Sequence, residues 1–102
     1  MIWKFITFLV RKLEPEVAHQ ISLIALKLGF HPRLKRIEIP VKINNLHFTN
    51  FLGVAAGFDK NAQIIERIHH LNFGLTEVGT ITPLPQYGNP KPRVFRLEKD
   101  KA

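Results

Sequence analysis

The feature that most constrains the fold is a strand, a helix and a second strand that follow one another within residues 51–79. Residues 51–56 are apolar and predict a buried strand, residues 61–71 predict a helix, and residues 75–79 predict another short strand. Strands joined by one crossover helix run parallel, so this order indicates an α/β fold. The helix should turn four apolar side chains inward: Ile64, Ile65, Ile68 and Leu71.

Two short helices are expected before this unit, over residues 2–13 and 15–28. Pro15 suits the first position of the second helix, and Glu16 would favour the positive end of its dipole. Gly29 is a natural stop. The second helix should carry an apolar face of four residues: Val17, Ile21, Ile24 and Leu28. The prediction is therefore a helical hairpin with apolar faces and a basic rim.

The remaining segments predict a hairpin and a loop. Residues 31–40 form a basic linker, and alternating apolar residues around Asn44-Asn45 predict two strands joined by a two-residue turn. Residues 82–93 hold four prolines and predict a loop, and residues 94–97 predict one more short strand. Two parallel strands and one helix do not cover both faces of a sheet, so we expect the front part of a larger α/β protein.

The charge of the chain is concentrated at its N-terminal end. Residues 1–36 hold seven of the 15 Lys and Arg residues but only two of the eight acidic ones. This imbalance implies an anionic partner, either a membrane surface or a nucleic acid. Residues 2–10 are interrupted by Lys4 and are shorter than the roughly 20 apolar residues of a membrane span.

No metal site is expected. The chain has no cysteine, which removes disulfides and thiolate ligands. His69 and His70 are adjacent on a predicted helix and would point about 100° apart, which makes them a poor pair of metal ligands. At least one of them is expected on the outer surface of the helix.

Small residues end both strands of the parallel unit, where ligands of such folds bind. Ala55-Ala56-Gly57 follows the first strand and Gly79-Thr80 the second. Missing side-chain bulk would let a flat ring or a phosphate approach the backbone, and Lys60 would stabilise negative charge on it. The alternative is that the small residues relieve packing, Asp59 caps the next helix and Lys60 is solvated.

Three segments resemble the amino-terminal part of the class 2, quinone-dependent dihydroorotate dehydrogenases: "LEPEVAHQISLIALKLG", "FLGVAAGFDKNAQ" and "FGLTEVGTITPLPQYGNPKPRVFRL". The resemblance implies an FMN-binding (β/α)8 TIM barrel, with residues 31–102 as its incomplete start. It implies that residues 1–30 are a membrane-associating helical hairpin that carries a quinone tunnel. The implied reaction oxidises dihydroorotate to orotate in UMP biosynthesis and passes electrons from FMN to ubiquinone. The implied location is peripheral, on the cytoplasmic face of a bacterial inner membrane.

The resemblance also implies roles for individual residues. Lys60 matches a lysine that touches both FMN and orotate, and His19 and Arg96 match residues of the quinone tunnel. A serine that acts as catalytic base is expected downstream, so no catalytic residue is assigned within this chain and the isolated chain should be inactive. The FMN-contacting segment corresponds to six residues: Ala56, Gly57, Phe58, Asp59, Lys60 and Thr80.

For two of these residues, a role on the protein surface outside the quinone tunnel remains an alternative. His19 would otherwise be a solvent-facing helix residue, and Arg96 would otherwise form a surface ion pair with Glu98 or Asp100. The rival function is a non-catalytic basic module that binds a membrane or a nucleic acid. Most phenylalanines fall in segments expected to be buried or membrane-facing, which leaves few aromatic rings for stacking on bases. No nucleic-acid partner is therefore expected, and residues 1–29 argue against a soluble class 1 enzyme, which lacks this hairpin.

Overall fold

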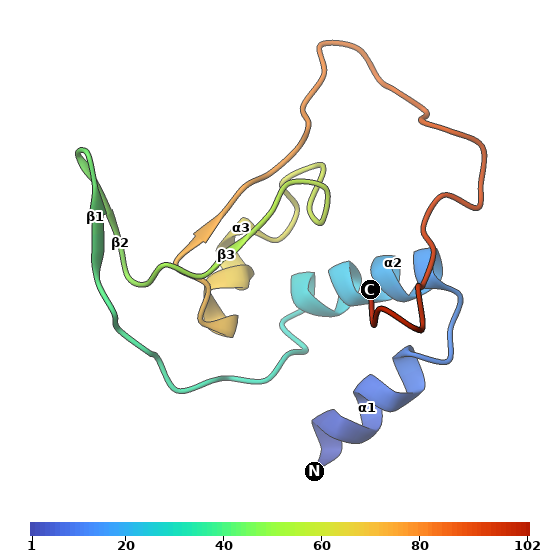
Figure 1. Ribbon diagram of the computed structural model, residues 1–102, viewed down its shortest axis with the longest axis horizontal. Coiled ribbons are helices and arrows are strands. Elements are labelled where there is room, and N and C mark those ends of the chain that lie inside the picture. The colour runs from blue at the N-terminus through green and yellow to red at the C-terminus, as the bar shows by residue number, and fades with distance from the viewer. The chain divides into compact units, whose positions relative to one another are not determined.

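The computed structural model describes residues 1–102 and divides into two compact units. Unit 1 consists of residues 1–22 together with residues 82–102, and unit 2 consists of residues 23–81. Figure 1 shows the helices and strands in chain order.

The two expected N-terminal helices are confirmed, with slightly earlier ends. The Glu14 carboxylate accepts hydrogen bonds from the backbone N–H groups of Glu16 and Val17, at 3.1 and 3.0 Å. It thereby caps the start of the second helix, and Pro15 occupies the first helical position as predicted. The helices are α1, Ile2–Val10, and α2, Pro15–Lys27.

The apolar face predicted for α2 lies exposed. Its residues Val17, Ile21, Ile24 and Leu28 are 42 to 78% accessible, whereas Ala18 and Leu26 are buried. Leu26 belongs to the core cluster of unit 2. The helix α1 likewise exposes Phe5 and Phe8. No helix of the protein has the length and apolar character needed to cross a membrane.

Unit 2 contains an antiparallel and a parallel strand pair. The predicted hairpin is confirmed: β1 pairs with β2 in antiparallel register, and Asn44 in the turn has a φ of +52°. The predicted parallel pair is also confirmed, with Gly53 opposite Leu75, although both strands are shorter than expected. The strands are β1, Val41–Ile43; β2, Leu46–Phe48; β3, Gly53–Val54; and β4, Leu75–Thr76.

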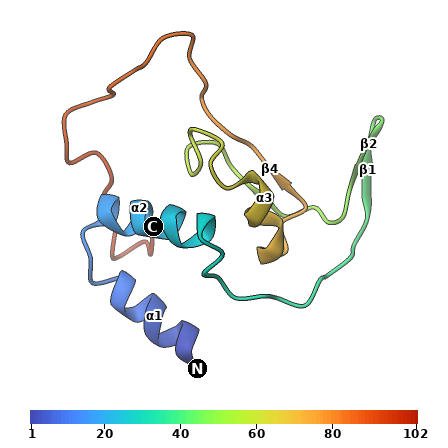
Figure 2. The same ribbon diagram turned by 180° about the vertical axis from the view of Figure 1, so that it is seen from behind.

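The helical part of the crossover between β3 and β4 is shorter than predicted. It consists of α3, Ile65–Ile68, and the 3-10 helix η1, His69–Leu71, which are drawn beside β4 in Figure 2. Helix begins only at residue 65 because the Asp59 carboxylate ties the preceding backbone into a loop. Asn72, with a φ of +67°, ends η1 directly after residue 71, where the predicted helix also ended.

The core of unit 2 is small and is formed by Leu26, Ile64 and Ile68, which are at most 7% exposed. Leu71 packs against this cluster as expected. Ile65 does not, because the first turn of α3 directs it outward and leaves it 48% exposed. The expectation for Ile65 was therefore wrong.

Asn50 joins the segments that lead into β3 and β4. Its buried side chain accepts from the backbone N–H groups of Leu52 and Gly74, at 2.9 and 3.1 Å, and donates to the Asn72 carbonyl at 2.8 Å. A side chain on Gly74 would clash with the Asn50 backbone, so glycine is required there. These contacts fix where the two parallel strands start.

The short strand expected over residues 94–97 is not formed. The backbone of Leu97 instead closes a terminal turn, in which its carbonyl accepts from the N–H groups of Asp100 and Ala102 at 3.1 and 3.2 Å. The backbone carbonyl of Leu97 is therefore paired within a local turn rather than with a neighbouring strand.

The contrast between adjacent isoleucines gives a test of this core. Ile64→Ala should lower the free energy of unfolding of unit 2 by about 2–5 kcal/mol, because it empties a buried site. Ile65→Ala should change it by less than about 1 kcal/mol, because that side chain is half exposed. Urea unfolding followed by circular dichroism measures both, and equal losses would contradict the packing described.

Candidate functional site

The segments that follow β3 and β4 are hydrogen-bonded to each other. Glu77 donates its N–H to the Val54 carbonyl at 2.9 Å, and Gly57 donates to the Gly79 carbonyl at 3.1 Å. Gly79 in turn donates to the Asp59 carbonyl at 3.2 Å. The structure therefore brings residues 56–60 and 79–80 together at the carboxyl ends of the two strands.

Glycine is required at both of the hydrogen-bonded positions 57 and 79. Gly57 has a φ of +101° and Gly79 a φ of +108°, a conformation that other residues rarely adopt. A side-chain carbon built on Gly57 would meet no atom within 4 Å, so its backbone faces open space. At Gly79 the same carbon would lie 2.8 Å from the Ile81 nitrogen. Only the first glycine therefore leaves a surface that a ligand could approach.

Three of the predicted site residues are exposed beside this opening: Ala56, Lys60 and Thr80. Together with Gly57 they form what we call the strand-end surface. It combines open backbone, a hydroxyl and an exposed ammonium group. The residues fit a flat aromatic ring that carries negative charge, because no side chain projects from Gly57 and the cation lies three residues further along the chain.

The other two predicted residues of this segment turn toward the protein. Phe58 is partly buried and packs against the core cluster of unit 2. Asp59 is 2% exposed, and its two carboxylate oxygens accept from the N–H groups of Gln63 and Ile64, at 2.8 and 3.0 Å. In this structure Asp59 shapes the loop before α3. The helix itself has Ile64 as its N-cap and no side-chain cap, so the capping role considered as an alternative is not observed.

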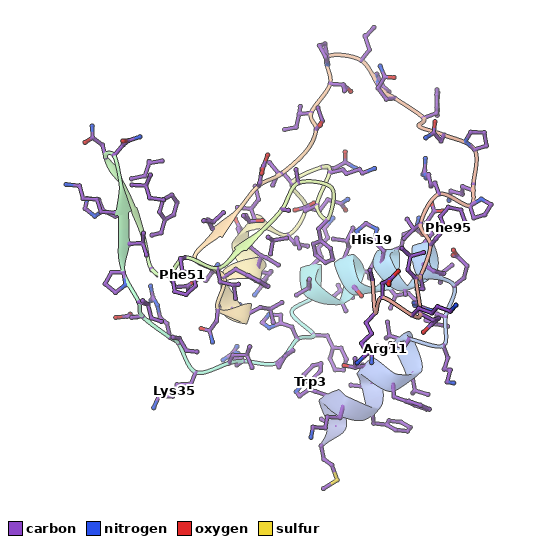
Figure 3. All side chains as sticks on the ribbon, viewed as in Figure 1. Trp3, Arg11, His19, Lys35, Phe51 and Phe95 are labelled. Carbon is purple, nitrogen blue, oxygen red and sulfur yellow. The ribbon has the colours of Figure 1, made fainter.

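The two predicted tunnel residues both belong to unit 1. His19 is partly buried on α2, where Figure 3 labels it. The Arg96 guanidinium donates to the carbonyls of Arg11 and Leu13, both at 2.6 Å, and to that of Val10 at 3.4 Å. Arg96 thus donates to backbone carbonyls at the end of α1 and just after it, where positive charge is favourable. It does not pair with the acidic residues considered as its partners.

Glu16 is a polar anchor that sequence reasoning missed. It is 8% exposed and accepts from Arg93 Nε at 3.0 Å, with Lys91 Nζ at 3.3 Å. Burial alone would raise the pKa of Glu16, but the hydrogen bonds and charges of Arg93 and Lys91 outweigh it and lower that pKa. The available signal was the basic pair in "KPR", residues 91–93. Through it, the C-terminal segment is fastened to α2 within unit 1.

Comparison with known families gives a match over most of the chain. The family model described as dihydroorotate dehydrogenase matches residues 38–102, which include the whole strand-end surface. A curated relative from Bartonella henselae, named dihydroorotate dehydrogenase (quinone), is 52% identical over 92 residues. One of the same name from Erythrobacter litoralis is 46% identical over 104 residues and covers 100% of the chain.

Solved structures agree with the sequence matches. The Eimeria tenella DHODH in complex with ferulenol superposes with a TM-score of 0.81 at 46% identity, over 85% of this chain and 24% of that one. The ligand-free enzyme from the same organism gives a TM-score of 0.80. The chain spans only 25% of the Bartonella relative and 30% of the Erythrobacter relative.

Two neighbouring charged residues should differ sharply in their effect on stability. Asp59→Ala removes the acceptor for two backbone N–H groups and should lower the free energy of unfolding by about 1.5–3 kcal/mol. Lys60→Ala changes an exposed side chain and should stay within about 0.5 kcal/mol of the unmodified protein. Chemical denaturation compares them; a stable Asp59→Ala variant would refute the structural role given to Asp59.

Proposed function

Because the chain belongs to the dihydroorotate dehydrogenase family, we propose that it supplies the amino-terminal portion of a quinone-dependent enzyme that oxidises dihydroorotate to orotate. The observation that carries this proposal is the family match over residues 38–102. The relatives of known name are quinone-dependent, and a non-catalytic basic module is not favoured by them. The α/β arrangement of unit 2 is proposed as the first part of a (β/α)8 barrel.

The strand-end surface is proposed to hold FMN, which when bound takes two electrons from dihydroorotate and passes them to ubiquinone. The open space at Gly57 gives a flat ring a place to lie without a side chain in the way. Ala56 adds little bulk beside it, and Thr80 offers a hydroxyl from the neighbouring strand end. The hydrogen bond between Gly57 and Gly79 holds these pieces in one surface.

Lys60 is proposed to contact both the cofactor and the substrate. Its side chain is exposed and lies three residues after Gly57 in the chain, which supports this proposal. A fixed positive charge favours extra electron density on a bound ring, and it also attracts the carboxylate of orotate. The buried Asp59 carboxylate supports this role indirectly, because it sets the path of the loop that carries Lys60. No catalytic base is assigned within these 102 residues.

Residues 1–30 are proposed to associate with a membrane surface and to admit ubiquinone. The apolar side chains of α1 and α2 are exposed and basic residues accompany them, a composition that suits helices lying at a lipid interface. His19 and Arg96 are proposed to line the path of the quinone. The proposed location is the cytoplasmic face of a bacterial inner membrane.

The role of Lys60 has a direct test in the full-length enzyme. Lys60→Ala should weaken retention of FMN and binding of orotate, and it should lower turnover by roughly a hundredfold, because it removes a cation placed where charge develops. Flavin absorbance and steady-state kinetics measure these effects. Lys42→Ala, an exposed lysine on β1, is the matched control and should leave both unchanged. Normal flavin content and kinetics in Lys60→Ala would contradict the proposal.

A deletion separates the quinone step from the flavin step. Removal of residues 1–22 leaves Leu23 and Leu26 to pack on unit 2, so FMN should be retained. Bleaching of the flavin by dihydroorotate should persist. The rate of ubiquinone reduction should fall by roughly a hundredfold, because ubiquinone is no longer positioned beside the flavin. Unchanged ubiquinone kinetics after the deletion would remove the tunnel assignment.

A further inference from the structure

A basic pocket lies at the amino ends of β3 and β4, whereas the strand-end surface lies at their carboxyl ends. It has a volume of about 630 Å³, and its walls include Asn50 before β3 and Gly74 before β4. No aspartate or glutamate lines it. Four lining residues carry positive charge or imidazole nitrogens: Arg33, Arg36, His69 and His70.

The walls of the pocket are held by hydrogen bonds of two asparagines. Asn72 donates its side-chain N–H to the Lys35 carbonyl at 2.6 Å and accepts from the Ile37 N–H at 3.3 Å. These bonds fasten the basic linker that carries Arg33 and Arg36. Asn50 fastens the opposite wall through the Gly74 N–H. The cations are therefore presented by a supported backbone.

The histidines lie close together. His31 Nδ1 lies 3.1 Å from the Pro32 carbonyl oxygen, and His31 Nε2 lies 3.4 Å from His70 Nδ1. Protonation of His70 makes both of its ring nitrogens N–H donors.

The charges around His70 are all positive. They come from the linker, through His31 and Arg33; from α3, through Arg67; and from η1, through His69. Partial burial, followed by these charges, lowers the pKa of His70. Arg36 has a partner in Glu38 at 3.3 Å, but both side chains are more than 60% exposed and such a pair is weak. The pocket therefore concentrates positive charge that the protein itself does not neutralise.

We propose that this pocket binds an oxyanion of the phosphate type and that binding is coupled to proton uptake by His70. Arginine presents paired N–H groups that match phosphate oxygens, and a protonated His70 adds an N–H donor from Nε2. The ligand is a phosphate group, carried either by a small metabolite in solution or by a lipid headgroup. The proposal is independent of the redox activity proposed above, since the two sites lie at opposite ends of the strands.

The coupling gives a definite pH dependence. Without an anion, partial burial and then the surrounding charges lower the pKa of His70. A bound anion opposes that shift and favours the charged ring. Binding should therefore tighten as pH falls from 7.5 to 6.0 through the titration range of histidine. Sulfate is the suitable probe for this arm, because its own charge stays constant over that range.

The test titrates the full-length protein with sulfate and with inorganic phosphate at constant ionic strength, followed by calorimetry or amide NMR. Arg33→Gln should weaken both by roughly tenfold, as expected for loss of a charged hydrogen bond. Lys42→Gln removes the same charge from β1, outside the pocket, and should leave the affinity unchanged. Equal affinities in these two variants would overturn the proposal.

Two further variants keep the test decisive. His70→Gln should bind sulfate with an affinity that no longer changes between pH 6.0 and 7.5, and a preserved pH dependence would exclude His70 as the linked group. Arg33→Lys keeps the charge but loses the paired donors, so its affinity should fall between those of the unmodified protein and Arg33→Gln. It also serves if Arg33→Gln does not fold, as judged by its thermal unfolding.

The source of the phosphate is distinguished by comparing glycerol 3-phosphate in solution with vesicles of phosphatidylglycerol, using phosphatidylcholine vesicles as the neutral reference. Binding of glycerol 3-phosphate that depends on Arg33 assigns the pocket to a soluble metabolite. Arg33-dependent binding of the anionic vesicles alone assigns it to a lipid headgroup. Binding of neither probe in an Arg33-dependent manner would overturn the site.

Discussion

The arrangement of unit 2 depends on one buried carboxylate. Asp59 accepts two backbone hydrogen bonds from the loop before α3, and its own carbonyl accepts one from Gly79. These bonds direct Ile64 into the core and leave Lys60 on the surface. A single side chain thereby joins the packing of the crossover to the position of the residue proposed to meet the ligand. A carboxylate in such surroundings is tolerated only because both oxygens are satisfied.

Local patterns in the sequence were sufficient for the order of the elements up to β4, but not for residues 94–97, where the expected strand is not formed. Alternating apolar residues around Asn44-Asn45 predicted the hairpin, and the small residues of "VAAG" and "VGT" predicted where the parallel strands open. The start of α3 was missed because Asp59 overrides the helical pattern from residue 61. Ile65 was misplaced for the same reason, since a helix that begins later presents a different face to the core.

Contacts between residues far apart in the chain lay beyond sequence reasoning. Asn50, Asn72 and Glu16 look like ordinary polar residues in the sequence, yet each joins segments that are distant along the chain. Hydrophobic periodicity carries no information about such partners. The pocket at the amino ends of β3 and β4 was missed for this reason, because Asn72 places the basic linker beside the histidines only in the folded chain.

The fastening of the C-terminal segment to the first helices bears on how the protein is made. Arg93 and Glu16 are separated by 77 residues, and Arg96 reaches carbonyls 83 to 86 residues earlier. At a synthesis rate of about 5–20 residues per second, the apolar helices leave the ribosome several seconds before their arginine partners exist. During that interval the nascent chain exposes apolar, positively charged helices that lack their C-terminal hydrogen-bond partners. A lipid surface or a chaperone could therefore bind these helices before the C-terminal segment does.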